Sequence, residues 1–267
     1  MLLKRLVFFG GKGGVGKSTL SSATALRLSE KGRTLLVSVD PAHSLTGIFG
    51  LEIGSQVKSL KENLYAVELS AEGLVEEYAQ RVLGAVGELL PSISSGLKEY
   101  TKHIKHSPTA LETVVLDRLV ELCNEYPFLV VDSAPTGQML RLFETAHMVR
   151  GWFEFLFRLA KERQKVERFM GREDNLLRLI EERRRKLETL ESILREKAVI
   201  FAVANEERLS IQEMETLRER LKNFRVYPLL NRWLGMEWKG PKVGWVKEPY
   251  GLEGLKRVEV GEILELL

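Results

Sequence analysis

A glycine-rich segment near the start of the chain has the residue types and spacing of a phosphate-binding loop. It reads Gly-Lys-Gly-Gly-Val-Gly-Lys-Ser over residues 11–18, which matches G-x-x-x-x-G-K-[ST], and it lies between an apolar run and a helical pattern. Glycines let backbone N–H groups turn inward around phosphate oxygens, and the following helix adds its positive end. The segment predicts binding of a nucleoside triphosphate, and the alternative is a glycine-rich turn without a ligand.

Two side chains of this loop have roles that follow from the motif. We expect Lys17 to reach the β- and γ-phosphates, and the Ser18 hydroxyl to ligate Mg²⁺. ATP and Mg²⁺ are therefore the expected cofactors. The predicted nucleotide-binding residues of the loop are Gly11, Lys12, Gly13, Gly14, Val15, Gly16, Lys17, Ser18 and Thr19.

Two aspartates each follow a short apolar run that predicts a strand. Asp40 comes after residues 33–39, and Asp132 comes after residues 128–131. An aspartate at the carboxyl end of a parallel strand faces the edge where phosphates bind. Asp40 could orient the attacking water or accept its proton, and the alternative is an Asp-Pro turn with a capping role. Asp132 has the position of a residue that contacts magnesium directly or through water, and residues 134–137 could sense the γ-phosphate.

The elements that must position these residues alternate between strands and helices. Strands are predicted at 4–9, 33–39, 64–69, 128–131, 198–204, 225–230 and 243–246, and helices at 17–31, 208–223 and the C-terminal end. Helical patterns also cover 70–126, 137–169 and 173–197. This alternation predicts an α/β fold, a three-layer sandwich in which helices cover both faces of a mostly parallel sheet.

The long helical stretches lie between strands, so they predict an α-helical insert subdomain beside the sheet. We expect residues 1–267 to form a single P-loop ATPase domain. Its core is predicted to comprise residues 1–69, 127–146 and 198–267, and its helical subdomain residues about 70–126 plus 147–197.

Composition and cysteine content exclude several classes of protein. The 267 residues carry 40 basic and 37 acidic side chains, a net charge of +3 that is too balanced to predict nucleic-acid binding. The single cysteine, Cys123, excludes an internal disulfide framework and a multi-cysteine metal site, and it fits a reducing cytoplasm. Residues 1–9 are apolar but too short for a membrane span, so a buried strand is expected there.

The extra lysine at position 12 carries a resemblance to a known group of ATPases. The sequence Gly-Lys-Gly-Gly-Val-Gly-Lys-Ser resembles the deviant phosphate loop of the MinD/ParA, nitrogenase iron protein and ArsA group. In that group the lysine crosses a dimer interface to the partner's nucleotide. The resemblance implies a homodimer in which Lys12 stabilises the charge that develops during phosphoryl transfer.

Two further segments narrow this resemblance. Residues 40–45, Asp-Pro-Ala-His-Ser-Leu, and residues 132–137, Asp-Ser-Ala-Pro-Thr-Gly, resemble the ArsA and tail-anchored-protein-targeting ATPases, and weaker similarity extends over about residues 4–260. The likeness implies that Asp40 orients the hydrolytic water, that Asn231 reads the adenine edge and that Pro249 forms another adenine wall. It also implies that the nucleotide-responsive switch loops contain Pro41, His43, Ser44, Pro135, Thr136 and Gly137.

The chain departs from this family in its cysteines. Eukaryotic targeting members carry a C-x-x-C that binds zinc across the dimer, and this sequence lacks it, so no zinc is expected. One cysteine cannot build the soft three-thiolate site at which ArsA pumps bind arsenite. A role as an arsenite pump ATPase is therefore not predicted, and Cys123 is expected to be a buried, small apolar residue.

An apolar stretch between Met148 and Met170 is the candidate surface for a client. Five apolar residues within 152–157 cannot share one helix face, which suggests contact with a client helix, a second subunit or, indirectly, a membrane. The alternative is burial between the helices of the insert.

The function predicted from these observations is a Mg²⁺-dependent, homodimeric ATPase switch of the cytoplasm. Its client is expected to be a hydrophobic helix of a tail-anchored membrane protein. One alternative is a MinD/ParA-like switch with another protein client or a partition role, and another is an ATP-binding scaffold without useful turnover.

Overall fold

The structure is a computed structural model that describes residues 2–39, 44–69, 73–74, 108–133, 136–137, 139–141, 143–144 and 175–267. Contacts within the chain separate two compact units. The first comprises Met1–Ser70, Glu121–Leu140 and Ile193–Leu267, and the second comprises Ala71–Val120 and Arg141–Ser192. The predicted single domain with a helical subdomain stays a prediction, and the candidate client surface at 148–170 lies outside the described residues.

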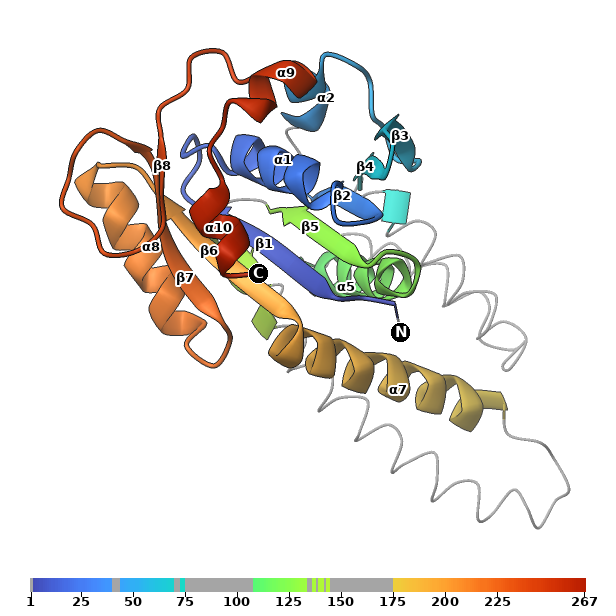
Figure 1. The fold of residues 1–267 in the computed structure, drawn as a ribbon. Helices are drawn as coiled ribbons and strands as arrows, with labels where there is room; N and C mark the ends of the chain where they lie inside the picture. Colours follow the sequence, from blue (N-terminus) through green and yellow to red (C-terminus); the bar gives the residue numbers. More distant parts are fainter. Residues whose placement is uncertain are drawn as a thin grey trace, which may run out of the picture. The chain divides into compact units, whose positions relative to one another are not determined.

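A largely parallel sheet forms the centre of the first unit (Figure 1). Within the described residues, eight strands follow the order β3-β4-β2-β5-β1-β6-β7-β8. The strands are β1 (Arg5–Gly11), β2 (Thr34–Ser38), β3 (Lys58–Lys61), β4 (Leu64–Glu68), β5 (Phe128–Asp132), β6 (Ala198–Ala204), β7 (Val226–Trp233) and β8 (Lys242–Gly244). Strand β3 pairs antiparallel with β4, and the other pairs are parallel, which confirms the predicted α/β fold.

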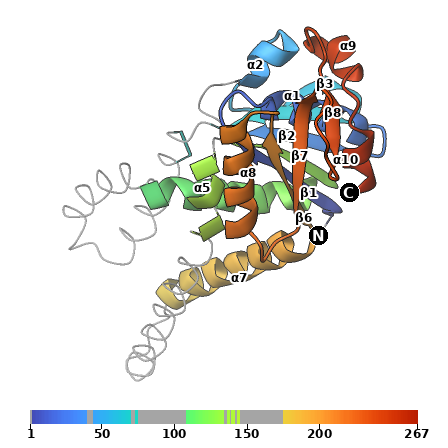
Figure 2. The same cartoon turned by 90° about the vertical axis from the view of Figure 1, so that its left-hand side faces the viewer.

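The helices of the described residues have bounds close to several predicted ones. They are α1 (Lys17–Leu28), α2 (Ser44–Phe49), α5 (Pro108–Glu125), α7 (Asn175–Glu196), α8 (Arg208–Arg220), α9 (Gly251–Lys256) and α10 (Gly261–Glu265). Helices α2 and α9 contact each other and lie together in Figure 2. Strand β3 and helix α2 were not predicted.

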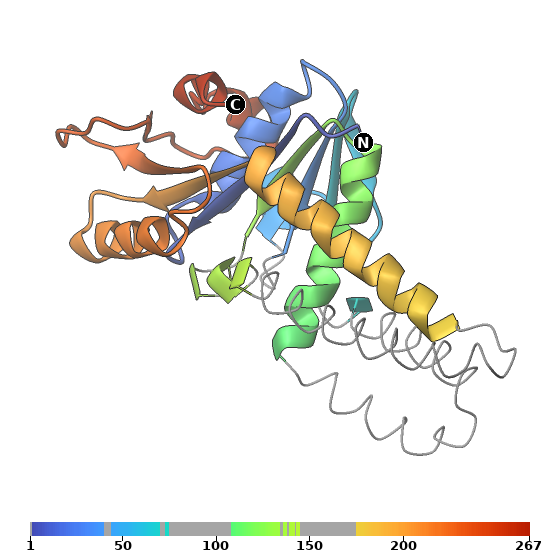
Figure 3. The ribbon, with the colours of Figure 1, turned by 90° about the horizontal axis from the view of Figure 1, so that it is seen from below.

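Alternating side chains of the central strands build a core on each face of the sheet. Val7 and Phe9 of β1 join the apolar cluster under α1, and Phe9 stacks on Phe201 with ring centroids 5.3 Å apart. On the other face, a Cβ added to Gly10 would lie 3.0 Å from Leu217 of α8. Helices α1 and α8 therefore cover opposite faces of the sheet, as Figure 3 shows.

Candidate nucleotide site

The loop between β1 and α1 has a backbone that only glycine can supply at two positions. Gly11 has φ 151°, and a Cβ there would lie 2.3 Å from the carbonyl oxygen of Val203. Gly16 caps α1 with φ 92°, and a Cβ there would lie 2.3 Å from Nδ2 of Asn231. The loop is thus packed tightly against β6 and β7, which fixes the amides that face a phosphate.

The two lysines of the loop have different environments. The side chain of Lys17 is only 5% exposed, and its Nζ donates to the carbonyl oxygen of Lys12 at 3.2 Å. Lys12 is half-buried, and its ammonium has no partner among the described residues. The side chain of Lys17 is therefore hydrogen-bonded within the loop. The ammonium of Lys12 is available to a group outside the described residues.

The three segments that the sequence predicts to contact the nucleotide start at paired positions of neighbouring strands. Phe9 of β1 and Ser38 of β2 both pair with Asp132 of β5. The N–H of Val39 donates to the carbonyl oxygen of Asp132 at 3.0 Å, and the Ser133 hydroxyl donates to that of Phe9 at 2.6 Å. The phosphate loop, the segment that starts at residue 40 and the turn after Asp132 therefore leave the same carboxyl edge.

The structure describes some of the predicted switch residues. Asp40, Pro41, His43 and Pro135 lie outside the described residues, and Ser44 is described by its backbone as the first residue of α2. Thr136 and Gly137 are helical, and the Thr136 hydroxyl donates to Oε2 of Glu213 in α8 at 3.3 Å. This bond connects the turn after Asp132 to a helix that packs under the sheet, and the sequence did not predict it.

Ser18 and Asp132 fit the needs of a magnesium ion that is shared with a nucleotide. Ser18 lies in the first turn of α1, and Asp132 is fully buried at the end of β5. In the described part of the chain, no three His, Cys, Asp or Glu side chains gather into a metal site. Magnesium in nucleotide sites takes one or two protein ligands and completes its shell with phosphates and water, so a sparse ligand set suits it.

A cavity of about 240 Å³ opens beside the start of α1. Its lining includes Gly16, Thr19, Asn231, Trp245, Pro249 and Tyr250. Pockets for drug-sized ligands measure about 300–1,000 Å³, so this cavity has room for a smaller group such as a single heterocyclic base. The predicted base-contacting residues Asn231 and Pro249 share this cavity with Gly16 of the loop and Thr19 of α1.

Asn231 has a contact that the sequence did not predict. Its side chain is 6% exposed, and Nδ2 donates to the carbonyl oxygen of Val15 at 2.7 Å. The side-chain amide of Asn231 thus supports the phosphate loop and also lines the cavity. The adenine contact itself stays a prediction.

The far wall of the cavity is held in a strained form and presents two aromatic rings. Arg232 and Glu248 have positive φ of 53° and 49°, a conformation that costs roughly 1–3 kcal/mol per residue and is frequent at functional sites. Trp245 and Tyr250 remain 59% and 61% exposed at the cavity. Sequence reasoning missed both aromatics, although their position next to Gly244 and Pro249 is a usable signal.

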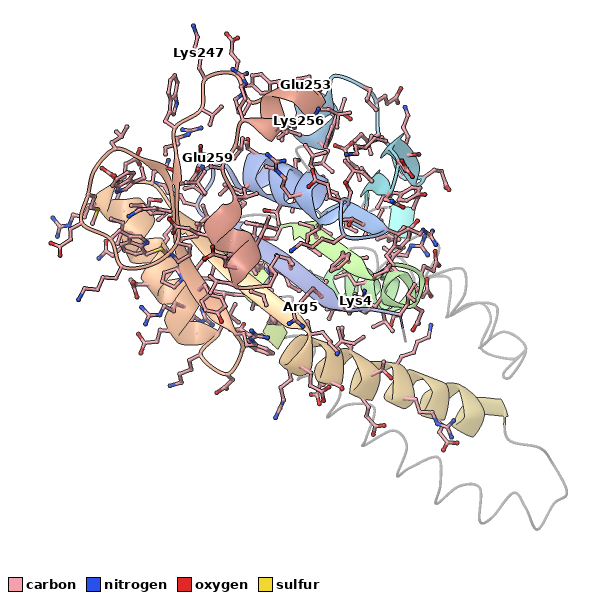
Figure 4. All side chains as sticks on the ribbon, in the orientation of Figure 1. Lys4, Arg5, Lys247, Glu253, Lys256 and Glu259 are labelled. Atoms are coloured by element: carbon pink, nitrogen blue, oxygen red, sulfur yellow. The ribbon has the colours of Figure 1, made fainter. Side chains whose placement is uncertain are left out.

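The loop between Trp245 and Tyr250 is hydrogen-bonded to the protein at Glu248 and extends into solvent at Lys247. Arg257 Nη2 donates to the carbonyl oxygen of Glu248 at 2.9 Å, whereas Lys247 projects away from the protein (Figure 4). On the exposed face of α9, Lys256 donates to Oε1 of Glu253 at 2.6 Å (Figure 4). The bond from Arg257 therefore holds the cavity wall at Glu248.

The described residues form helices of at most 22 residues. None of them combines the length and the apolar character that a span requires.

Comparison with known proteins places the chain among ATPases. The family model for anion-transporting ATPases matches residues 4–228. A putative arsenical pump-driving ATPase 2 from Aquifex aeolicus is 35% identical over 228 residues, which cover 82% of this chain and 76% of that protein.

More distant relatives carry two kinds of name. A putative arsenical pump-driving ATPase from Prosthecochloris vibrioformis is 33% identical over 231 residues, which cover 78% of this chain but 55% of that protein. An ATPase ASNA1 homolog 1 from Paramecium tetraurelia is 28% identical over 250 residues, covering 82% of this chain and 71% of that protein. The chain thus spans about half the length of one relative and most of the other two.

Proposed function

This chain belongs to the anion-transporting ATPase family and is an ATP hydrolase, and from that premise we propose that it works as a magnesium-dependent, dimeric nucleotide switch. One observation carries the proposal: Phe9, Asp132 and Ser38 stand in one row of the sheet. The segments that would sense the γ-phosphate follow β5 and β2, the next two strands on one side of β1 and its phosphate loop. A change in the nucleotide therefore reaches both segments over a short distance.

The chain's own residues divide the work of hydrolysis. Lys17 holds the β- and γ-phosphates, and Asp40 orients the attacking water or accepts its proton. Ser18 and Asp132 would hold magnesium, which neutralises phosphate charge when it is bound. Asn231 and the cavity at Trp245 receive the base.

Lys12 is the residue that makes the switch dimeric. Its ammonium has no partner among the described residues, although the same loop buries Lys17. We assign the Lys12 ammonium to the nucleotide of a second copy of the chain, where it stabilises charge on the transferred phosphoryl group. Hydrolysis followed by release of inorganic phosphate removes that charge, so the closed pair loosens afterwards.

Two relatives are named as putative arsenical pump-driving ATPases, which raises arsenical pumping as another function, but the thiol chemistry of this chain does not favour it. Cys123 is 1% exposed, and burial raises the pKa of its thiol to about 12. Arsenite binding needs several thiolates, and Cys123 is the single cysteine of this sequence. We therefore propose a protein client rather than an oxyanion as the partner of the switch.

The client that we propose is the hydrophobic helix of a tail-anchored membrane protein. The support is the resemblance of residues 40–45 and 132–137 to targeting ATPases, together with the excess of apolar residues between Met148 and Met170. The contact between Thr136 and Glu213 gives the turn after Asp132 a direct link to α8, through which a nucleotide signal can leave the site. A switch with another protein client is the second candidate.

The test uses an Asp40→Asn variant that binds ATP but does not hydrolyse it. Size-exclusion chromatography with light scattering should give a monomer without nucleotide and a dimer with ATP and Mg²⁺. A tail-anchor helix carrying a photocrosslinker should be captured in one nucleotide state, and the same helix with two lysines at its centre should not. A dimer that captures neither helix supports the second candidate, and a monomer in every state contradicts the switch itself.

A further inference from the structure

We propose that Glu68 is a positioning residue for ATP hydrolysis, because its carboxylate fixes the first turn of α2 and with it the end of the segment that carries Asp40. The inference rests on the proposed role of Asp40. Glu68 is the last residue of β4, so it lies at the carboxyl edge of the sheet like the residues that lead into the nucleotide site.

Both carboxylate oxygens of Glu68 bind one residue of α2. The backbone N–H of Thr46 donates to Oε1 at 3.0 Å, and the Thr46 hydroxyl donates to Oε2 at 3.1 Å. Glu68 is only 3% exposed. Glutamate is rarely buried to this degree unless its oxygens are satisfied, and each oxygen of Glu68 accepts one bond from Thr46.

The segment between β2 and α2 is fixed at its first end by the sheet. Val39 N–H donates to the carbonyl oxygen of Asp132 at 3.0 Å, and Leu69 N–H donates to that of Ser38 at 2.9 Å. Residues 40–43 follow, and α2 begins at Ser44. The second end therefore depends on the orientation of the first turn of α2, which Glu68 holds through its two bonds to Thr46.

Thr46 and the backbone of Glu68 also bind the connection that follows α2. The Thr46 hydroxyl accepts a bond from the N–H of Ile53 at 3.3 Å, and the N–H of Glu68 donates to the carbonyl oxygen of Gly54 at 2.9 Å. Thr46 therefore both donates to Glu68 and accepts from the chain that leaves α2. This leaves little freedom for the helix to turn about its axis.

Apolar packing by itself already attaches α2 to the protein. Leu45, Ile48 and Phe49 are 0%, 6% and 7% exposed and belong to the apolar cluster under α1. Loss of the carboxylate should therefore leave the helix attached but let it turn. A displacement of about 1 Å at a catalytic group can cost a hundredfold in rate, so the effect should appear in kcat before it appears in stability.

The experiment compares Glu68→Gln and Thr46→Val with a matched control, Glu52→Gln, whose residue is exposed in the connection that follows α2. We expect both test variants to lose about tenfold or more in kcat while KM for ATP stays within about twofold. The double variant should be no slower than the slower single variant, because both changes break the same interaction between Thr46 and Glu68. Thr46→Ser keeps the hydroxyl and should keep the rate, and Glu52→Gln should match the wild type.

Asp40→Asn is measured in parallel so that two failures can be told apart. If Asp40→Asn abolishes turnover while folded Glu68→Gln keeps the wild-type kcat, the positioning role is wrong and the proposed role of Asp40 stands. If Asp40→Asn itself keeps turnover, the proposed role of Asp40 fails and the positioning role fails with it. A Glu68→Gln variant that loses ATP binding and melting temperature along with kcat would show a structural residue, which also overturns the inference.

Discussion

Asn231 supports the phosphate loop through a nearly buried amide whose Nδ2 lies 2.7 Å from the Val15 carbonyl oxygen. Asn231→Ala would leave that carbonyl unsatisfied, which costs roughly 1–3 kcal/mol of stability. Asn231→Asp should be worse, because a carboxylate cannot donate and two acceptors would face each other. We expect a lower melting temperature for both variants and weaker ATP binding by calorimetry, larger for Asp. Unchanged affinity in both variants would contradict the support role.

Cys123 should be chemically silent at neutral pH. Burial raises its pKa to about 12, so the reactive thiolate forms only as the pH approaches that value. Native protein should therefore resist iodoacetamide and react only after unfolding in guanidinium, as mass spectrometry would show. Cys123→Ala should keep ATPase activity within about twofold and cost about 1 kcal/mol of stability. Rapid labelling of the native protein, or stimulation of its ATPase by arsenite, would contradict this assignment.

Among the elements, the turn after β7 is held by one carboxylate oxygen. Oε1 of Glu206 accepts the N–H groups of Leu234, Gly235 and Met236 at 2.7, 3.2 and 3.2 Å. These bonds, the one from Leu234 first, lower the pKa of Glu206 below its usual range. The folded state thus favours the charged form, so the bonds are intact above the pKa of the unfolded chain and are lost as the pH falls through the lowered pKa.

Hydrogen exchange tests this turn directly. At pH 7 the amides of 234–236 should be protected, and their protection, corrected for intrinsic exchange, should decrease below the usual carboxyl range. Glu206→Gln should reduce protection at pH 7 and remove the pH dependence, whereas its neighbour Glu207→Gln should behave as the wild type. Equal protection in Glu206→Gln and wild type at pH 7 would mean that the carboxylate does not hold the turn.

The elements that the sequence predicted best have a local signal. Strand β6 was predicted with its observed bounds, because all seven of its residues are apolar and buried between Lys197 and Asn205. Strand β3 was missed because its four residues are polar or half-exposed and show no apolar alternation. Helix α2 has six residues, too few for a helical period to appear.

The candidate site also has parts with a local sequence signal and parts without one. The phosphate loop could be predicted because its residues are contiguous and match a motif. The bond from Asn231 to Val15 spans 216 positions in the sequence, and the bond between Thr46 and Glu68 spans 22. Such pairs depend on strand order, which no local pattern contains.

At the scale of the whole molecule, the Lys12 ammonium, which has no partner in the part of the chain that the structure describes, and the exposed apolar groups at the cavity support the proposed second copy of the chain. Trp245 and Tyr250 line the cavity and are more than half exposed, and Leu234 at the end of β7 is 79% exposed. Apolar side chains gathered around a polar site commonly mark an interface. ATPase activity per chain should therefore rise with protein concentration and reach a plateau once the dimer forms, which a dilution series would measure.

The most direct test of the dimeric switch mixes two inactive variants, Lys12→Ala and Asp40→Asn. In a mixed dimer, the site of the Lys12→Ala chain keeps its own Asp40 and receives Lys12 from its partner. An equal mixture should therefore recover roughly a quarter of the wild-type ATPase rate, since half of the dimers are mixed and each has one complete site. If the mixture stays as inactive as the two variants alone, Lys12 does not act across the dimer and the account is wrong.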